Sequence, residues 1–321
     1  MRNMIIQNAA IKVMRHLLSA PLLLLVLCFS AKVFAAVADT RQVIMIVGYD
    51  GRYWYPYTAV LESNIKHRDW EKITAIENPV AVTRQPQTGH FFVKEDNGEV
   101  VQWLRQNDKL ESKPLPALDS TQLSYTHLRA HNGGLLAVKL IQGKSRETEL
   151  TNFDSQLNKV SSVVKQASAQ FHPLQINNTL FYSHVSCRLA CSPVIQEVWQ
   201  RDMVSNKTRQ LTLFNATTYL HSVDNNKKFA YINSNVSGYY QLGRLNLMTG
   251  ENQWLTQGQV THSYPSIANN GSLYFIRRDY QGATLSVLPN ASKIILDESQ
   301  LKTIALPKSV TKIRYLEITE Q

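Results

Sequence analysis

The sequence has few of the features that usually reveal an activity. It contains three cysteines among 321 residues, no block of like charge, and neither a Gly-x-Ser-x-Gly nor a His-Glu-x-x-His motif. These absences argue against the common serine-hydrolase and zinc-protease arrangements. Helical spacing of apolar residues is also missing from the repeated part of the chain. What the chain does hold is short runs of bulky residues separated by turn residues, which is the pattern of an all-β protein.

The first 35 residues differ in character from the rest. A basic lead precedes the apolar run Leu17–Leu27, and the small residues that follow offer a cleavage site. This layout is typical of a secretory signal peptide, so we expect residues 1–35 to be removed and residues 36–321 to form one domain in the periplasm. The alternative is an uncleaved inner-membrane anchor over Leu17–Ala36, which is long enough to span a bilayer.

The stretch His221–Thr256 predicts one complete structural unit. An inner strand ends at Val223, and Lys228–Asn233 carries the next strand after a tight turn. Asn235–Gly238 is rich in residues that tolerate positive φ and therefore reverses the chain. Tyr239–Leu247 and Gln253–Thr256 complete a four-stranded antiparallel blade. A single blade cannot bury both of its faces, so it needs neighbours built in the same way.

The same unit recurs along the chain. Each repeat is marked by an apolar triplet that directly follows a turn, and the triplets begin at Phe91, Leu135, Leu180, Phe229 and Leu273, which are 44, 45, 49 and 44 residues apart. Continuing the period adds a sixth unit split between Gln42–Gly48 and Thr311–Thr319. The sequence therefore predicts an all-β, six-bladed β-propeller of four-stranded antiparallel blades, with the ring closed by the N- and C-terminal strands. A seventh blade would require another unit within Tyr49–Ile76.

The later blades resemble the repeats of TolB-type propellers. The resemblance rests on Leu245–Glu251 followed by Leu255-Thr256, on Thr208–Thr212, and on Tyr264-Pro265-Ser266 followed by Asn269-Asn270-Gly271. No blade keeps the Pro-Asp-Gly turn of that family intact. The resemblance implies a six-bladed propeller. In that family, propellers serve in a Tol-Pal-like envelope system, as outer domains of membrane-bound regulators, and beside hydrolase domains.

Two cysteines bracket a short loop. Cys187 and Cys191 stand between the predicted strands Leu180–Val185 and Val194–Met203, where the longest repeat has its extra residues. In an oxidising compartment we expect them to form a disulfide, which would contribute roughly 2 kcal/mol by limiting the unfolded chain. The alternative is a redox pair, or a metal site that includes His184, although two thiolates without further ligands make a poor zinc site.

Three histidines occupy one position of the repeat. His127, His172 and His221 each stand eight residues before a repeat marker, and the next blade has Pro265 there. Since the first strand of a blade is innermost, we expect these side chains near the mouth of the central channel. Imidazoles on adjacent blades could bind a divalent metal or an anionic group, or act as acid and base. The alternative is that they are merely tolerated there, or that strand alternation turns them away from the channel.

We therefore expect a non-enzymatic propeller, without a cofactor, that binds a protein or a cell-envelope component. Residues 1–35 hold four of the 34 basic side chains and no acidic one, so 30 basic and 24 acidic side chains remain, and this surplus is spread over the rest of the sequence. We expect no nucleic-acid partner outside the cytoplasm. Two alternatives remain open. One is a membrane-anchored sensor domain, and the other is a metal-dependent hydrolase or lyase that uses the histidine cluster at the channel mouth.

Overall fold

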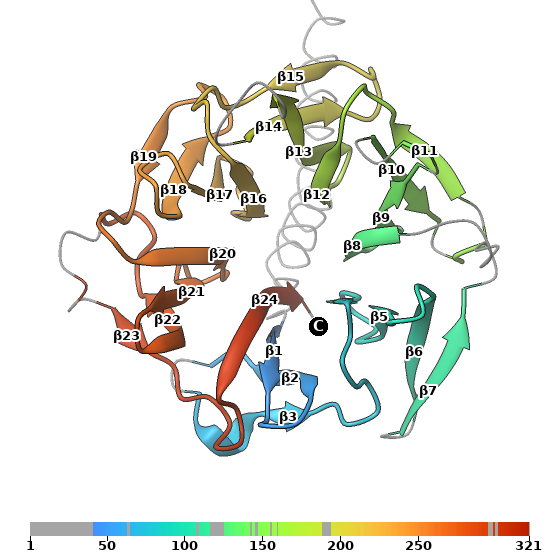
Figure 1. Cartoon of the computed structure of the whole chain (residues 1–321), viewed down its shortest axis with the longest axis vertical. Coiled ribbons are helices and arrows are strands. Elements are labelled where there is room, and N and C mark those ends of the chain that lie inside the picture. Colours follow the sequence, from blue (N-terminus) through green and yellow to red (C-terminus); the bar gives the residue numbers. More distant parts are fainter. Residues whose placement is uncertain are drawn as a thin grey trace, which may run out of the picture. The chain divides into compact units, whose positions relative to one another are not determined.

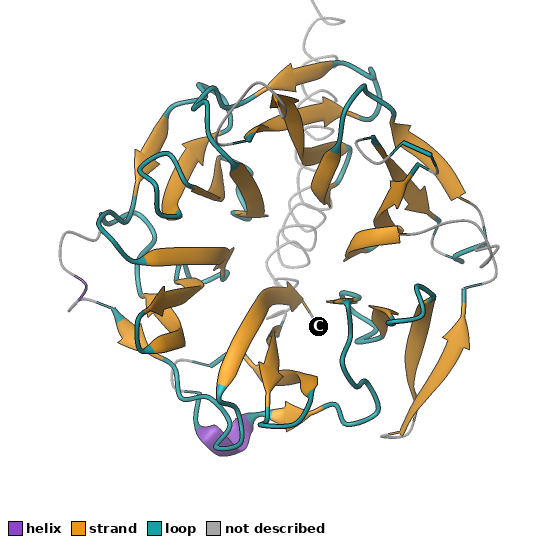
Figure 2. Ribbon diagram, viewed as in Figure 1, coloured by secondary structure: helices purple, strands orange, loops and turns teal. Residues whose placement is uncertain are grey.

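The computed structural model describes residues 41–320 except 63–64, 107–108, 116–124, 142, 145–146, 155, 159, 188–193, 295–297 and 299–300. The predicted signal peptide or anchor lies outside this part of the chain. In the part that is described, no helix is both long and apolar enough to cross a membrane. Strands make up the regular structure together with the short 3-10 helix η1 (His67–Asp69), as Figure 2 shows.

The strands form six sheets of four antiparallel strands each, and the sheets follow one another around a ring (Figure 1). We number the blades in chain order, with the innermost strand of blades 1 to 5 first. Blade 1 contains β4 (Ala81–Arg84), β5 (Phe91–Lys94), β6 (Val100–Gln106) and β7 (Lys109–Pro114). Blade 2 contains β8 (Tyr125–His131), β9 (Gly134–Leu140), β10 (Thr148–Phe153) and β11 (Val160–Val164). Blade 3 contains β12 (Gln170–Ile176), β13 (Thr179–Cys187), β14 (Ile195–Asp202) and β15 (Thr208–Gln210).

The remaining sheets complete the ring. Blade 4 contains β16 (Thr218–Val223), β17 (Phe229–Ser234), β18 (Gln241–Asn246) and β19 (Asn252–Trp254), and blade 5 contains β20 (Thr261–Ile267), β21 (Leu273–Asp279), β22 (Gly282–Leu288) and β23 (Lys302–Thr303). Blade 6 runs β24 (Lys312–Glu320), β1 (Gln42–Tyr49), β2 (Trp54–Val60) and β3 (Glu71–Lys72). The prediction of six blades closed by strands from both ends is confirmed. Trp54–Val60 belongs to blade 6, so the segment considered for a seventh blade is already used.

The repeat markers begin, or nearly begin, the second strand of each blade. Phe229 opens β17, and Leu135 is the second residue of β9. These second strands are largely buried, for example at five of the seven positions of β9 and at four of the seven positions of β21. A strand covered on both faces by neighbouring blades needs a continuous apolar run rather than an alternating one. This requirement explains why the markers are apolar triplets.

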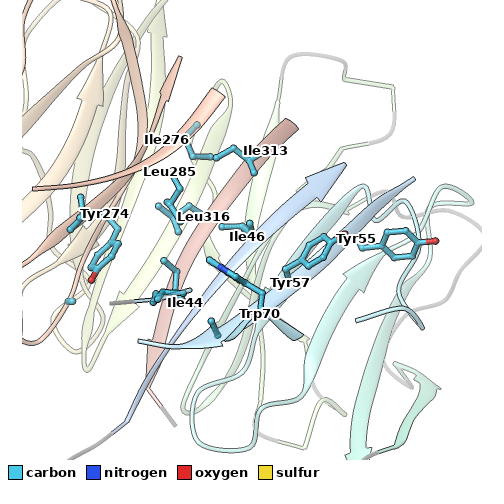
Figure 3. Close-up of a cluster of buried hydrophobic side chains, with 14 residues drawn as sticks. Ile44, Ile46, Tyr55, Tyr57, Trp70, Tyr274, Ile276, Leu285, Ile313 and Leu316 are labelled. Atoms are coloured by element: carbon cyan, nitrogen blue, oxygen red, sulfur yellow. The ribbon is translucent and has the colours of Figure 1, made fainter. Parts of the chain in front are cut away.

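Packing between blades makes the core. Figure 3 shows one such cluster, in which Ile44 and Ile46 of β1 lie against Leu285 of β22 and Leu316 of β24. All four side chains are at most 2% exposed. Because the cluster joins blade 5 to the blade shared by the two ends of the chain, it fixes the ring closure through burial of apolar surface.

A buried carboxylate ties the closing strand to the next two blades. Glu317 of β24 is 1% exposed and accepts hydrogen bonds from Thr83 Oγ1 at 2.9 and 3.1 Å and from the Arg84 backbone N–H at 3.2 Å. Its Oε1 also lies 3.1 Å from Nη1 of Arg129 on β8. The Glu317 carboxylate therefore joins blades 6, 1 and 2. Its hydrogen bonds and ion pair compensate for the cost of burying an ionised group.

Candidate functional site

The innermost strands share an irregularity at one level of the channel. In blade 2, Thr126 pairs with Val138 and Arg129 with Leu136, so His127 and Leu128 stand opposite a single residue. The register shifts in the same way at His172-Pro173, His221, Tyr264-Pro265 and Arg314. Each shift is a β-bulge, which redirects a side chain that simple alternation would place elsewhere. Five of the six innermost strands therefore present a bulged residue at this level.

Three of these bulges carry unusual backbone conformations. His127 and His172 both have φ of 50°, and Tyr264 has φ of 55°. Positive φ is uncommon for bulky residues and costs on the order of 1–3 kcal/mol at each position. Strain that recurs at equivalent positions of three blades is typical of a functional site, because the surrounding structure must hold it in place.

The bulges bring the three predicted histidines together. The ring centroids of His127 and His172 lie 4.4 Å apart, and those of His172 and His221 lie 5.5 Å apart. Both contacts are edge to face, so the imidazoles form a continuous row from blade 2 to blade 4. The concern that alternation turns these side chains away from the channel does not apply, because each of them sits at a bulge.

The row continues through tyrosines in the next two blades. His221 lies 5.0 Å from Tyr264 of β20, and Tyr264 lies 5.4 Å from Tyr315 of β24, measured between ring centroids. The sequence count assigned this position in blade 5 to Pro265. Pro265 is the second bulged residue of blade 5, and Tyr264, the first, occupies the position equivalent to His127 and His172.

A cavity of about 240 Å³, which we call the histidine cavity, lies among these side chains. All six innermost strands contribute to its walls, so it lies on the channel axis. Its polar lining residues are Thr126, His127, Arg129, His172, His221, Tyr264, Arg314 and Tyr315. Among the described residues that line it there is no carboxylate, serine or cysteine side chain. Val80, which is 50% exposed, also lines the cavity and marks its opening to solvent.

The imidazoles are held in the neutral form. Burial lowers the pKa of His127 to about 4 and that of His221 to about 3, and it lowers the pKa of His172 well below its ordinary value. Nearby cations act in the same direction, since Lys94 lowers the pKa of His127 and Arg129 lowers those of His172 and His221. All three rings are therefore uncharged at neutral pH.

Two arginines bring positive charge to the cavity. Arg129 is ion-paired with Glu317, whereas Arg314 donates from Nη2 to the carbonyl oxygen of Pro79 and lies 4.5 Å over the ring of Trp54. Among the described residues, no ion pair joins Arg314 to a carboxylate. Sequence reasoning missed both arginines. Neither arginine belongs to a motif that would have identified it in the sequence.

Metal binding finds no support in the geometry. Within the described part of the chain, no group of three or more histidine, cysteine, aspartate or glutamate side chains is placed to hold a metal ion. The predicted disulfide is not tested, since Cys187 ends β13 but Cys191 lies outside the described residues. That pairing stays a prediction.

Comparisons with known proteins agree on the fold. No protein-family model matches the sequence, and no curated protein is similar to it in sequence. TolB from Acinetobacter baumannii matches with a TM-score of 0.63 at 11% identity, over 89% of this chain and 70% of that chain. A chain of a nidogen–laminin complex matches with a TM-score of 0.60 at 8% identity, over 87% and 98%. Oligogalacturonate lyase from Vibrio parahaemolyticus matches with a TM-score of 0.53 at 10% identity, over 84% and 83%.

The structure thus defines a six-bladed propeller similar to those of TolB. The resemblance predicted from the blade repeats is confirmed at the level of the fold. The same fold carries binding proteins and enzymes, so function must be argued from the site itself.

Proposed function

We propose that this protein is a non-enzymatic binding propeller of the periplasm that receives a segment of a partner protein in the histidine cavity. The observation that carries this proposal is the cavity itself, which is rich in aromatic rings, imidazoles and arginine and has no carboxylate, serine or cysteine side chain among its described lining residues. Tyrosine and arginine are the residues that most often dominate binding energy at protein interfaces.

The protonation states of the histidines favour binding over catalysis. General acids and bases work best when their pKa lies near the operating pH. The pKa values of about 4 for His127 and about 3 for His221 are far from neutrality. No carboxylate lines the cavity, among the described residues, to orient an imidazole or to raise its basicity. The geometry therefore supports recognition of a ligand and offers no acid–base pair.

Photo-crosslinking in cells tests the proposal. A photoreactive amino acid at Val80 would stand at the opening of the cavity, and the same group at Val204, 74% exposed in the turn after β14, provides the control. We expect Val80 to give a discrete adduct with one partner, and we expect the adduct to disappear when His127, His172 and His221 are all replaced by alanine. An equal adduct from Val204, or none from Val80, would contradict the proposal.

A turnover assay tests the alternative that the protein is an enzyme. Turnover of a glycan or lactone by the purified protein, lost in His172→Ala, would replace the binding proposal with a catalytic one. The sensor alternative depends on whether the N-terminal segment is retained, which mass measurement of the protein isolated from cells determines.

A further inference from the structure

The positive charge that lines the histidine cavity has no carboxylate beside it among the described lining residues. Arg129 has Glu317 as its partner, but that carboxylate also serves Thr83 and Arg84 and does not line the cavity. Arg314 has a carbonyl oxygen and an aromatic face as partners and no ion pair among the described residues. Burial lowers the pKa of Arg314, which means that its charge is incompletely solvated.

The charged groups around the imidazoles also favour a positive potential in the cavity. The groups around the three rings are Lys94 of β5, Arg129 of β8, Tyr219 of β16, Tyr264 of β20, and Arg314 and Tyr315 of β24. Glu317 of β24 pairs with Arg129 and does not line the cavity. Lys94 lowers the pKa of His127 and Arg129 lowers the pKa values of His172 and His221, and no carboxylate acts on these rings to raise them. The potential at the cluster is therefore positive, which disfavours a metal cation and favours an anion.

We infer that the histidine cavity binds a carboxylate group of the partner, with Arg314 and the three imidazoles as its donors. This inference rests on the proposed function and specifies the chemistry that the site recognises. A volume of about 240 Å³ corresponds to about eight water molecules, so the cavity admits one side chain and excludes a folded element. An aspartate or glutamate side chain on an exposed segment of the partner is small enough for the cavity and has the opposite charge.

Binding of a carboxylate here takes up protons. His221 Nε2 donates to Asn233 Oδ1 at 2.7 Å, so the neutral ring has no second N–H to offer until Nδ1 is protonated. A carboxylate next to the ring favours the charged imidazolium and raises its pKa. The affinity must therefore increase as the pH falls from neutrality, and binding must be accompanied by proton uptake.

Calorimetry on the full-length protein with two matched peptides provides the test. The probes are acetyl-Gly-Glu-amide and acetyl-Gly-Gln-amide, each titrated at pH 7.0 and 5.5 in two buffers that differ in ionisation enthalpy. We expect the glutamate peptide to bind at least about tenfold more tightly than the glutamine peptide, as charge-assisted hydrogen bonds do over neutral ones. We also expect tighter binding at pH 5.5, with a buffer-dependent enthalpy that reports proton uptake.

Two variants locate the binding group. Arg314→Gln should weaken the glutamate peptide about tenfold or more, while Arg68→Gln, at a side chain 81% exposed and away from the cavity, should leave the affinity unchanged. Shifts of the imidazole nitrogens of His127, His172 and His221 on titration of the unmodified protein provide a readout that does not depend on a variant folding.

The outcomes separate the two proposals. Equal affinities for the two peptides, no binding of the glutamate peptide at millimolar concentration, or an unchanged affinity in Arg314→Gln would overturn the carboxylate inference. If the Val80 adduct still forms in that case, the binding function stands and only the ligand chemistry is wrong.

Discussion

The two ends of the channel are built from different parts of the same strands. The histidine cavity is made by bulged side chains within the innermost strands. At the other end of the channel, which we call the turn end, a second cavity of about 510 Å³ is lined by the last residues of β8, β12, β16 and β24 and by adjoining turns, including Asn132-Gly133 and Asp224-Asn225. Arg129 lines both cavities and separates them together with Glu317.

Polar groups at the turn end already have local partners. His131 Nε2 lies 2.9 Å from Asn152 Oδ1, and Asp224 accepts the backbone N–H groups of Lys228 and Phe229 at 2.8 and 3.0 Å. Turn formation therefore explains these side chains. In the histidine cavity, His221 has a similar partner in Asn233 Oδ1 at 2.7 Å, but Arg314 has a carbonyl oxygen and an aromatic face and no ion pair among the described residues. Polar groups at the mouth of a propeller therefore indicate a ligand site where they include a charge that the surrounding structure does not pair with an opposite charge.

The largest loss of stability is expected from removing the ion pair of Arg129 with Glu317, which lies between the two cavities. Arg129→Leu leaves the buried carboxylate of Glu317 without its cation, and we expect the free energy of unfolding to fall by about 3–5 kcal/mol. Chemical denaturation measures this loss. Arg105→Leu is the matched control, because Arg105 pairs with Glu71 at 2.7 Å on the surface and its removal should cost less than about 1 kcal/mol. Equal losses in the two variants would contradict the structural role of the buried pair.

Acid should destabilise the protein through the histidine row. The folded-state pKa values of about 4 for His127 and about 3 for His221 lie below the ordinary value of 6.5, so unfolding takes up protons between these limits. Stability is therefore fully present above pH 6.5 and falls as the pH is lowered, by up to about 1.4 kcal/mol per pH unit for each neutral histidine.

Denaturation midpoints between pH 7 and 4 check this dependence. Replacing His127, His172 and His221 by phenylalanine, which keeps an aromatic ring at each position, should reduce the slope over this range and leave the part due to His262, whose pKa burial lowers to about 4. The depressed pKa of Asp50, caused mainly by its hydrogen bond with Lys72, matters only below the ordinary value of 3.8 and does not overlap with this window. An unchanged slope in the phenylalanine variant would show that other groups carry the pH dependence.

The smallest loss of stability is expected for a substitution at the turn end of the channel. His131→Gln removes a partly buried hydrogen bond to Asn152, and we expect a loss of at most about 1 kcal/mol with no change in affinity for the glutamate peptide. Thermal unfolding and the same calorimetric titration measure both quantities. A large loss of affinity in this variant would mean that the ligand binds at the turn end and not in the histidine cavity.

Much of the fold could be predicted because blade repeats are local. Within His221–Thr256, the turns at Asp224–Lys227 and Asn235–Gly238 and the start of β17 at Phe229 agree with the sequence pattern. The inner strand begins three residues earlier than predicted, at Thr218. Turn residues and apolar triplets act over a few positions, so their spacing is visible without knowledge of tertiary contacts.

The candidate site was only partly predictable. Recurrence at one repeat position identified the histidines, but whether they face the channel depended on bulges that strand alternation does not predict. The contribution of Tyr264 was missed because the blades differ by one residue between inner strand and marker. Arg314 and the pair of Arg129 with Glu317 were missed because their partners lie far away in the sequence.

The sequence by itself determined the number of blades, the closure of the ring by both ends, and the recurrence of histidine on three neighbouring inner strands. These features follow from local periodicity and from the need of each blade to bury both faces. Only the tertiary structure decided that the imidazoles share one cavity with Arg314 and with no carboxylate among its described lining residues. Charge balance at a site depends on groups from every strand around it, because electrostatic interactions act through space and are not limited to neighbours in the chain.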